Sequence, residues 1–165
     1  MWAVIKIDKK KVSFLKNDFS KKIGADFEIY DPKICVQKFK NNKIITKEIN
    51  LLGDYIFCFH KSFKDKKMIN SLKFVKGLKY FLNGFNQSQS DLENFINKCR
   101  NSENNNGHLS SEFFNLAINK KFKFSSGPFT SKIFQIIELQ KNKIKIAMGK
   151  IETTIKKEDF SFLPI

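Results

Sequence analysis

The C-terminal third of the chain contains short runs of apolar residues, most of which alternate with polar ones. Four such runs occur, at residues 122–124, 133–139, 144–146 and 151–155. Alternation with a period of two predicts β-strands, and their regular spacing predicts a small barrel. Turn-forming residues separate the runs at Gly127-Pro128, Lys141-Asn142 and Gly149. A helix over the last two runs would scatter their isoleucines around its circumference, so a barrel is favoured over a helical hairpin.

The first hundred residues contain runs with the two-residue period of strands and runs with the 3.6-residue period of helices. Strands are predicted at residues 2–7, 27–30, 34–39, 43–49, 51–59 and 73–82, and helices at residues 11–23, 62–72 and 88–99. Gly24 is placed to end the first helix, and Asn41-Asn42 is predicted to form the tip of a hairpin. This order of elements predicts an antiparallel α+β sandwich with helices packed on the sheet.

The helix at residues 88–99 has the strongest pattern. Ser90 followed by Glu93 fits a capping box, which predicts that the helix begins at Ser90. The expected buried stripe consists of Leu92, Phe95, Ile96 and Cys99.

A polar segment separates the two halves. Residues 101–107 are rich in Asn and contain no apolar anchor, which is typical of a linker. Residues 111–118 are predicted as a short helix with Ser111 as its cap. We therefore expect an N-terminal domain at residues 1–100, a linker at 101–115 and a C-terminal domain at 116–165.

Charge and cysteine content narrow the class of protein. The 165-residue chain has a formal net charge of +15, which favours work beside nucleic acid. The abundance of Lys, Asn, Ile and Phe is also what an AT-rich genome would produce, and the lysines are spread along the chain instead of clustered. Cys35, Cys58 and Cys99 are odd in number and far apart, which indicates reduced thiols. With neither a signal peptide nor an apolar run long enough to cross a membrane, a cytoplasmic protein is expected.

Candidate chemistry is sparse. The glycines are isolated, so no phosphate-binding loop is predicted. Cys58 and His60 lie two residues apart and would share one face of a strand, but two ligands do not make a zinc site. A buried thiol beside a satisfied or exposed histidine is the favoured interpretation. No nucleophile–base or acid–base set can be assembled from these residues. We therefore expect that the protein is not an enzyme and binds neither a cofactor nor a metal.

Several segments resemble one family in the order of the chain. Phe122-Lys-Phe-Ser-Ser-Gly-Pro-Phe129 and the strands after it resemble the KOW domain that closes NusG-type transcription factors. Four places in the first hundred residues are similar to the NusG N-terminal domain. They are Trp2, the segment around Pro32, Leu52-Gly-Asp-Tyr55-Ile-Phe57 and Val75-Lys-Gly77. The capped helix near residue 90 matches the helix that closes that domain. The chain thus resembles the NusG family along nearly its whole length, and a specialised paralogue fits as well as the general factor.

The resemblance implies a fold and a function. The fold would be an N-terminal antiparallel α/β sandwich followed by a small five-stranded barrel of the KOW or SH3-like type. The N-terminal domain of such a transcription elongation or antitermination factor binds two clamp helices of RNA polymerase. The resemblance places Leu52, Tyr55, Phe57 and Phe81 in that binding depression, with contact favoured for Tyr55 and Phe81. From the residues alone, the core is favoured for Phe59.

The KOW domain would bind a second partner. The family uses Rho or a small-subunit ribosomal protein there, and the matching positions are Ala147 and Met148, with Phe129 of the Gly-Pro-Phe loop as a further expected contact. The resemblance also places lysines near upstream DNA or nascent RNA, and we expect a monomer. The rival interpretation is a KOW-containing RNA-binding or ribosome-associated protein whose basic strands contact rRNA.

Overall fold

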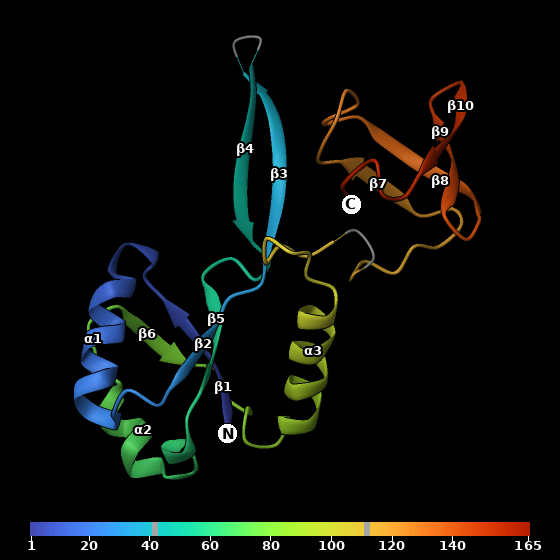
Figure 1. The fold of residues 1–165 in the computed structure, drawn as a ribbon. Helices are drawn as coiled ribbons and strands as arrows, with labels where there is room; N and C mark the ends of the chain where they lie inside the picture. Colours follow the sequence, from blue (N-terminus) through green and yellow to red (C-terminus); the bar gives the residue numbers. More distant parts are fainter. Residues whose placement is uncertain (41–42, 111–112) are drawn as a thin grey trace. The chain divides into compact units, whose positions relative to one another are not determined.

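The computed structural model of the chain describes residues 1–40, 43–110 and 113–165 (Figure 1). The residues group into two units. The first unit contains residues 1–32 and 50–100, and the second contains residues 33–49 and 101–165. The predicted hairpin tip at Asn41-Asn42 and the predicted helix cap at Ser111 lie outside the described residues. The predicted boundaries at residues 100 and 116 stay a prediction.

The first unit has four strands, three α-helices and two short 3-10 helices (η1, η2) among its described residues. Its elements are β1 (Trp2–Ile7), η1 (Lys9–Lys11), α1 (Val12–Ile23), β2 (Glu28–Tyr30), β5 (Tyr55–Phe59), η2 (Lys61–Lys64), α2 (Lys66–Leu72), β6 (Leu78–Phe81) and α3 (Gln89–Asn101). Asn101, the last residue of α3, is grouped with the second unit. The second unit contributes β3 (Lys33–Lys40), β4 (Lys43–Asn50), β7 (Lys121–Phe124), β8 (Ile133–Leu139), β9 (Lys143–Met148), β10 (Ile151–Lys156) and β11 (Phe162–Pro164). The predicted α+β class is confirmed, with three helices and several antiparallel sheets in the described residues.

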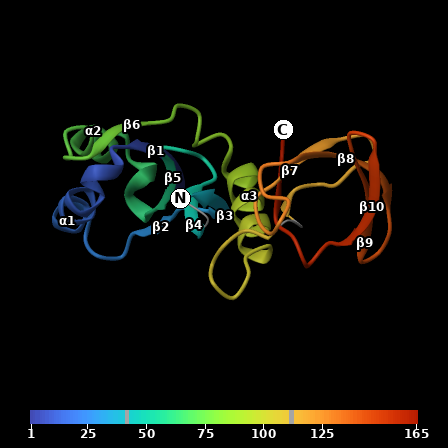
Figure 2. The ribbon, with the colours of Figure 1, turned by 90° about the horizontal axis from the view of Figure 1, so that it is seen from above.

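The sheet of the first unit has the strand order β2-β5-β1-β6, and its paired strands are antiparallel. Helices α1 and α2 lie on one side of this sheet and α3 lies on the other (Figures 1 and 2). On the α1 side, Ile5, Ile56 and Cys58 pack against Leu15 and Phe19 of α1. Leu15 and Phe19 are four residues apart, so one face of the helix carries both. Gly24 ends α1 as predicted, and its N–H donates to the carbonyl of Ser20.

The start of α3 differs from the prediction. The helix begins at Gln89, so Ser90 is its second residue and the predicted capping box is wrong. The Gln89 side chain accepts a hydrogen bond from the N–H of Trp2 at 2.9 Å and donates to the Trp2 carbonyl at 2.7 Å. These two bonds attach the helix to β1. The predicted stripe is confirmed, because Ile96 and Cys99 are buried while Leu92 and Phe95 are half-buried against the cores.

Two predicted strands are shorter than expected. The run at residues 51–59 forms a turn over its first four residues, and β5 begins at Tyr55. Similarly, β6 begins at Leu78, since the residues before Gly77 end α2 and form turns. In both cases an apolar run includes residues that pack from a turn, which periodicity alone does not separate from a strand.

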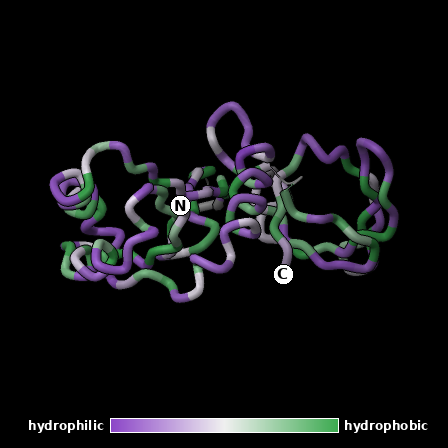
Figure 3. Tube along the Cα trace, turned by 90° about the horizontal axis from the view of Figure 1, so that it is seen from below, coloured by the Kyte–Doolittle hydropathy of each residue, from purple (hydrophilic) through white to green (hydrophobic). Residues whose placement is uncertain are grey.

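The C-terminal sheet belongs to the second unit and has the order β10-β9-β8-β7-β11. The four predicted runs are all strands, and β11 adds a fifth by pairing Phe162 with Phe124 of β7. Hydrophobic (green) and hydrophilic (purple) segments follow one another along the tube in this part of the chain (Figure 3). One face forms a core, which consists of Phe122, Phe124, Phe134, Ile136, Ile144, Ile146, Ile155 and Phe162. Closure of the sheet into a barrel stays a prediction, and no α-helix forms over the described residues 113–118.

Gly77 is a position where the fold demands glycine. Its φ is +94°, and a Cβ there would lie 2.6 Å from the carbonyl oxygen of Lys11. Its own carbonyl accepts a hydrogen bond from Asp8, which holds the end of β1 beside the start of β6. Gly84 has a similar φ of +86°, but a Cβ there would meet nothing within 4 Å.

We predict that Gly77→Ala destabilises the chain more than Gly84→Ala. Both variants strain the backbone, which costs about 1–2 kcal/mol. Only Gly77→Ala adds a steric overlap, which contributes a further 1–3 kcal/mol or so. Chemical unfolding monitored by circular dichroism measures both. Equal losses of stability in the two variants would contradict the close approach to Lys11.

Candidate functional site

The face of the first sheet that carries α3 also carries Tyr55. In the register of β1 with β5, Trp2 pairs with Phe59, Val4 with Phe57 and Lys6 with Tyr55. Antiparallel partners share a face, and alternate residues of a strand do so as well. These six residues therefore form three cross-strand pairs on the α3 side. Tyr80 of β6 pairs with Lys6 on its other edge and extends the Lys6–Tyr55 pair to a row of three.

Helix α3 covers part of this face. A buried cluster forms from Trp2, Val4, Phe57 and Ile96. The guanidinium carbon of Arg100 lies 5.5 Å from the ring centre of Trp2 and 5.1 Å from that of Tyr30, and Arg100 forms an ion pair with Glu28. Cation–π contacts of this kind reinforce the attachment of the helix end.

Beyond α3 the same face stays accessible. We call Lys6, Tyr55, Tyr80 and Leu82 the open strip. Tyr80 is 42% exposed and Leu82 is 43% exposed, while Lys6 and Tyr55 are half-buried. The N–H of Leu82 donates to the carbonyl of Val4, so the strand alignment continues past the end of β6. The open strip thus presents two aromatic rings, one ammonium group and one aliphatic side chain.

The structure brings together three of the four predicted polymerase-binding residues. Leu52, Tyr55 and Phe57 belong to the cluster on the α3 side, where Phe57 is only 3% exposed. Phe81 pairs with Ile5 and lies on the opposite face, where it is 9% exposed and contacts the rings of Phe63 and Phe85. It is therefore not beside Tyr55.

The expectation of a core position for Phe59 is wrong. Phe59 lies at the end of β5, is 36% exposed and contacts Trp2 at 5.3 Å between ring centres. The strand ends there, and the next residue, His60, is buried instead.

An irregularity in β6 explains why sequence analysis chose Phe81 and missed Tyr80. The register with β1 shifts between Lys6 and Ile7, so Leu78 and Phe81 both enter the α1-side core although they are three residues apart. A bulge of this kind reverses the alternation of faces. Lys79-Tyr80-Phe81-Leu82 is uniformly strand-like in sequence, and the resemblance alone favoured the phenylalanine.

The open strip has a polar centre. The hydroxyl groups of Tyr55 and Tyr80 are hydrogen-bonded at 2.7 Å, and the Lys6 ammonium lies 5.2 Å and 5.7 Å from the two ring centres. The hydrogen bond lowers the pKa of Tyr55 and raises the pKa of Tyr80. The charge that Tyr55, and then Tyr80, gains on ionisation raises the pKa of Lys6. Since a lysine is cationic at neutral pH even without such a shift, the centre of the open strip carries a positive charge.

The predicted residues of the C-terminal partner site lie on different surfaces. Phe129 and Met148 pack partly against the core of the C-terminal sheet, and the ring of Phe129 contacts Phe124 and Phe160. Ala147 pairs with Gln135 and Glu152, on the opposite face of β9 from Ile146 and Met148. Each of the three side chains is partly exposed, and a common binding site stays a prediction.

Cys58 and His60 are held by the fold. Burial raises the pKa of the Cys58 thiol to about 12, so it is protonated and unreactive at neutral pH. His60 accepts a hydrogen bond from the N–H of Ser62 through Nδ1, and its Nε2 lies 3.2 Å from Asp26. Within the described ranges, no group of three or more His, Cys, Asp or Glu side chains is arranged to bind a metal.

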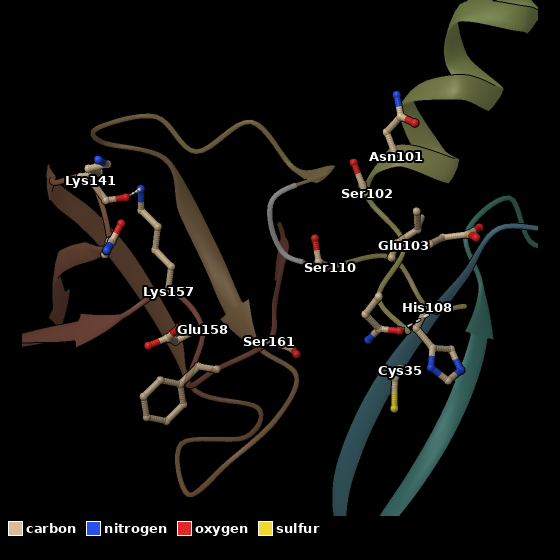
Figure 4. Close-up of a pocket in the computed structure, with 14 residues that line it drawn as sticks. Cys35, Asn101, Ser102, Glu103, His108, Ser110, Lys141, Lys157, Glu158 and Ser161 are labelled. Carbon is tan, nitrogen blue, oxygen red and sulfur yellow. Dashed lines mark hydrogen bonds between the residues drawn. The ribbon is translucent and has the colours of Figure 1, made fainter. Parts of the chain in front are cut away.

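The second unit contains a polar cavity of about 500 Å³ (Figure 4). Lysines and carboxylates both line it, among them Glu103, Lys141, Lys157 and Glu158, and Lys157 donates to the carbonyl of Lys141. The mixed charges select no one class of ligand.

A charged cluster near this cavity closes the base of the β3–β4 hairpin. Glu48 accepts from Lys33 at 2.9 Å and lies 2.8 Å from Nε2 of His108. The N–H of Leu109 donates to the carbonyl of Lys33. The segment predicted as a linker therefore pairs with β3 at this point.

No helix in the described part of the chain is both long and apolar enough to cross a membrane.

Comparison with known proteins gives structural likenesses only. No family model matches the sequence, and no curated relative is detected. The structure is similar to that of an MjSpt4:Spt5 complex, with 12% identity, coverage of 100% of this chain and 98% of that one, and a TM-score of 0.29. It is also similar to Thermotoga maritima NusG, with 14% identity, coverage of 94% and 91%, and a TM-score of 0.31. Both TM-scores are too low to establish a common arrangement, so a functional proposal has to come from this chain's own residues.

We predict that Phe81→Ala lowers the stability of the chain much more than Tyr80→Ala does. Truncation of a buried phenylalanine costs about 3–5 kcal/mol, so Phe81→Ala should strongly lower the free energy of unfolding. Tyr80→Ala removes only an exposed ring pair, worth about 1 kcal/mol. Urea unfolding measures both, and a larger loss in Tyr80→Ala would overturn the assignment of the two faces.

We predict that Glu48 contributes to stability above its ordinary pKa of 4.5. The hydrogen bond from Lys33, and then that from His108, lowers the pKa of Glu48 in the folded chain. This contribution is present above pH 4.5 and is lost as the pH falls through the lowered value. The fall in unfolding free energy between pH 6 and about pH 3 should be smaller in Glu48→Gln than in the wild type. Glu158→Gln is the control, and an unchanged fall in Glu48→Gln would exclude this linkage.

Proposed function

We propose that this chain is a NusG-type transcription elongation factor that binds RNA polymerase through its first unit. The observation that carries the proposal is the open strip. A sheet face left partly uncovered beside α3, with exposed aromatic and aliphatic side chains, is suited to a protein partner. Tyr55 is the residue shared by this strip and the predicted clamp-binding set.

The order of elements supports the proposal independently. The chain begins with a tryptophan strand, places a hairpin before the Tyr55 strand and closes the unit with a helix, in the order that the resemblance implies. The five strands after residue 120 are consistent with a KOW barrel. A resemblance of both halves of the chain to the two NusG domains, in the same order, is more specific than a resemblance of one half alone.

The proposed mechanism is steric and electrostatic. Bound to the clamp helices, the first unit bridges the clamp across the nucleic-acid channel and opposes its opening, which changes pausing. The net charge of +15 keeps lysines available near upstream DNA or nascent RNA. The factor acts as a cytoplasmic monomer, and no catalytic group takes part.

The C-terminal sheet takes a second partner in this proposal. Phe129, Ala147 and Met148 are the proposed contact residues, and Rho or a small-subunit ribosomal protein is the proposed class of partner. Phe129 is half-buried and Met148 lacks the size of an aromatic ring, so binding there should be weaker than at the open strip.

The test is retention of RNA polymerase from the same organism by the immobilised full chain. We predict that retention survives nuclease digestion and that Tyr55→Ala weakens it at least tenfold. Phe14→Ala is the matched control, because Phe14 is an exposed ring on α1. Its retention should stay within about twofold of the wild type, as expected for a residue outside the interface.

Loss of retention after nuclease digestion would contradict the proposal. That result would favour a KOW-containing RNA-binding or ribosome-associated protein, in which polymerase is carried along by RNA. Equal weakening by Tyr55→Ala and Phe14→Ala would also count against the open strip as the interface.

A further inference from the structure

Lys6 has an unusual environment for a surface lysine. Two other lysines near the open strip, Lys9 and Lys79, pair with Asp54 at 3.9 Å and 4.0 Å. The Lys6 ammonium instead lies over the rings of Tyr55 and Tyr80, and it forms no ion pair with a carboxylate of the described residues. A half-buried cation in the centre of an aromatic surface attracts an anionic partner group.

The positive charge extends past the strip. Beyond Tyr80 and Leu82 the surface opens into a hollow of about 560 Å³ between β6 and α2. Its lining includes Lys66, Lys73 and Lys79 and contains no carboxylate. Because β6 is the edge strand and α2 lies on the other side of the sheet, these lysines add positive charge at the edge of the strip, which favours an acidic partner.

The shape of the strip favours a helix. Tyr55, Lys6 and Tyr80 are cross-strand neighbours on β5, β1 and β6, so they form a row about 10 Å wide. This width matches the diameter of an α-helix of about 10–12 Å. Leu82 follows Tyr80 by two residues, just past the end of β6, and its N–H still donates to the carbonyl of Val4. Two residues of extended chain span about 6.6 Å, which is close to the rise of one helical turn, about 5.4 Å.

Stacking of a nucleobase fits the strip less well. Bases bind flat on exposed aromatic faces. Here the two rings meet edge to face, their hydroxyl groups are hydrogen-bonded, and the Lys6 ammonium already occupies the ring faces. The arrangement leaves a charged point flanked by ring edges, which suits a single carboxylate.

We propose that the open strip binds an acidic amphipathic helix of the partner protein, with one carboxylate paired to Lys6 and an apolar residue one turn away packed on Leu82. This inference rests on the proposed function in that RNA polymerase supplies the helix. It adds the chemistry of recognition, namely a specific acidic residue, and assigns Lys6, Tyr80 and Leu82 to the interface.

The test compares Lys6→Met, Lys6→Arg and Lys9→Met in the full chain, by measuring affinity for RNA polymerase at low and high salt. Lys6→Met should bind about tenfold more weakly at low salt, and its affinity should fall less steeply with salt than that of the wild type, because one charge pair is removed. Lys6→Arg should keep affinity within about threefold. Lys9→Met is the control, since that lysine pairs with Asp54, and it should change affinity less than twofold. Thermal unfolding of each variant checks that the fold is intact.

The outcomes separate the two proposals. If the wild-type chain does not bind polymerase, the proposed function fails and this inference fails with it. If the wild type binds but Lys6→Met matches Lys9→Met, the acidic-helix inference alone is overturned. A fluorescent DNA duplex serves as a second probe. If Lys6→Met weakens DNA binding tenfold while polymerase binding is unchanged, the strip recognises phosphate and the inference is likewise wrong.

Discussion

Strand β1 holds the first unit together through hydrogen bonds on both of its edges. It pairs with β5 from Trp2 to Lys6 and with β6 from Ile5 to Ile7. Gln89 brackets the backbone of Trp2 and so fixes the start of α3, while Asp8 bonds to Gly77 and fixes the approach to β6. Both faces of β1 are buried except at Lys6. The only half-buried position within the strand is therefore the one at the centre of the open strip.

This constraint links folding to the proposed binding surface. The face of the sheet opposite α1 and α2 carries aromatic residues, and α3 covers Trp2, Val4 and Phe57 on it. It leaves the β6 side of the same face accessible. Partner binding would then bury side chains already held in place by cross-strand pairing, so little ordering entropy is lost. A site built on paired strands in this way is rigid without contributing much to the core.

Sequence periodicity predicted the elements better than their ends. Alternation at Phe122 and Phe124 identified β7 because one face is fully buried and the other is solvated. The ends were harder, because the Ser90–Glu93 pair imitates a cap inside a helix whose start is set by Gln89 and its contact with Trp2. The candidate site was partly predictable. Tyr55 was found, whereas Tyr80 was missed because the bulge opposite Lys6 reverses the faces of β6, and a bulge depends on pairing that the local sequence does not encode.

The most direct measurement of the central claim is site-specific photocrosslinking. A photoreactive benzoylphenylalanine replaces Tyr80 in one full-length protein and Phe14 in another, and each is irradiated with RNA polymerase after nuclease treatment. The proposed interface predicts an efficient crosslink from position 80 to a helix of the polymerase that carries acidic residues, and little from position 14. Crosslinking to the polymerase from position 14 but not from position 80 would contradict the account. So would crosslinking from position 80 to nucleic acid in a sample without nuclease treatment.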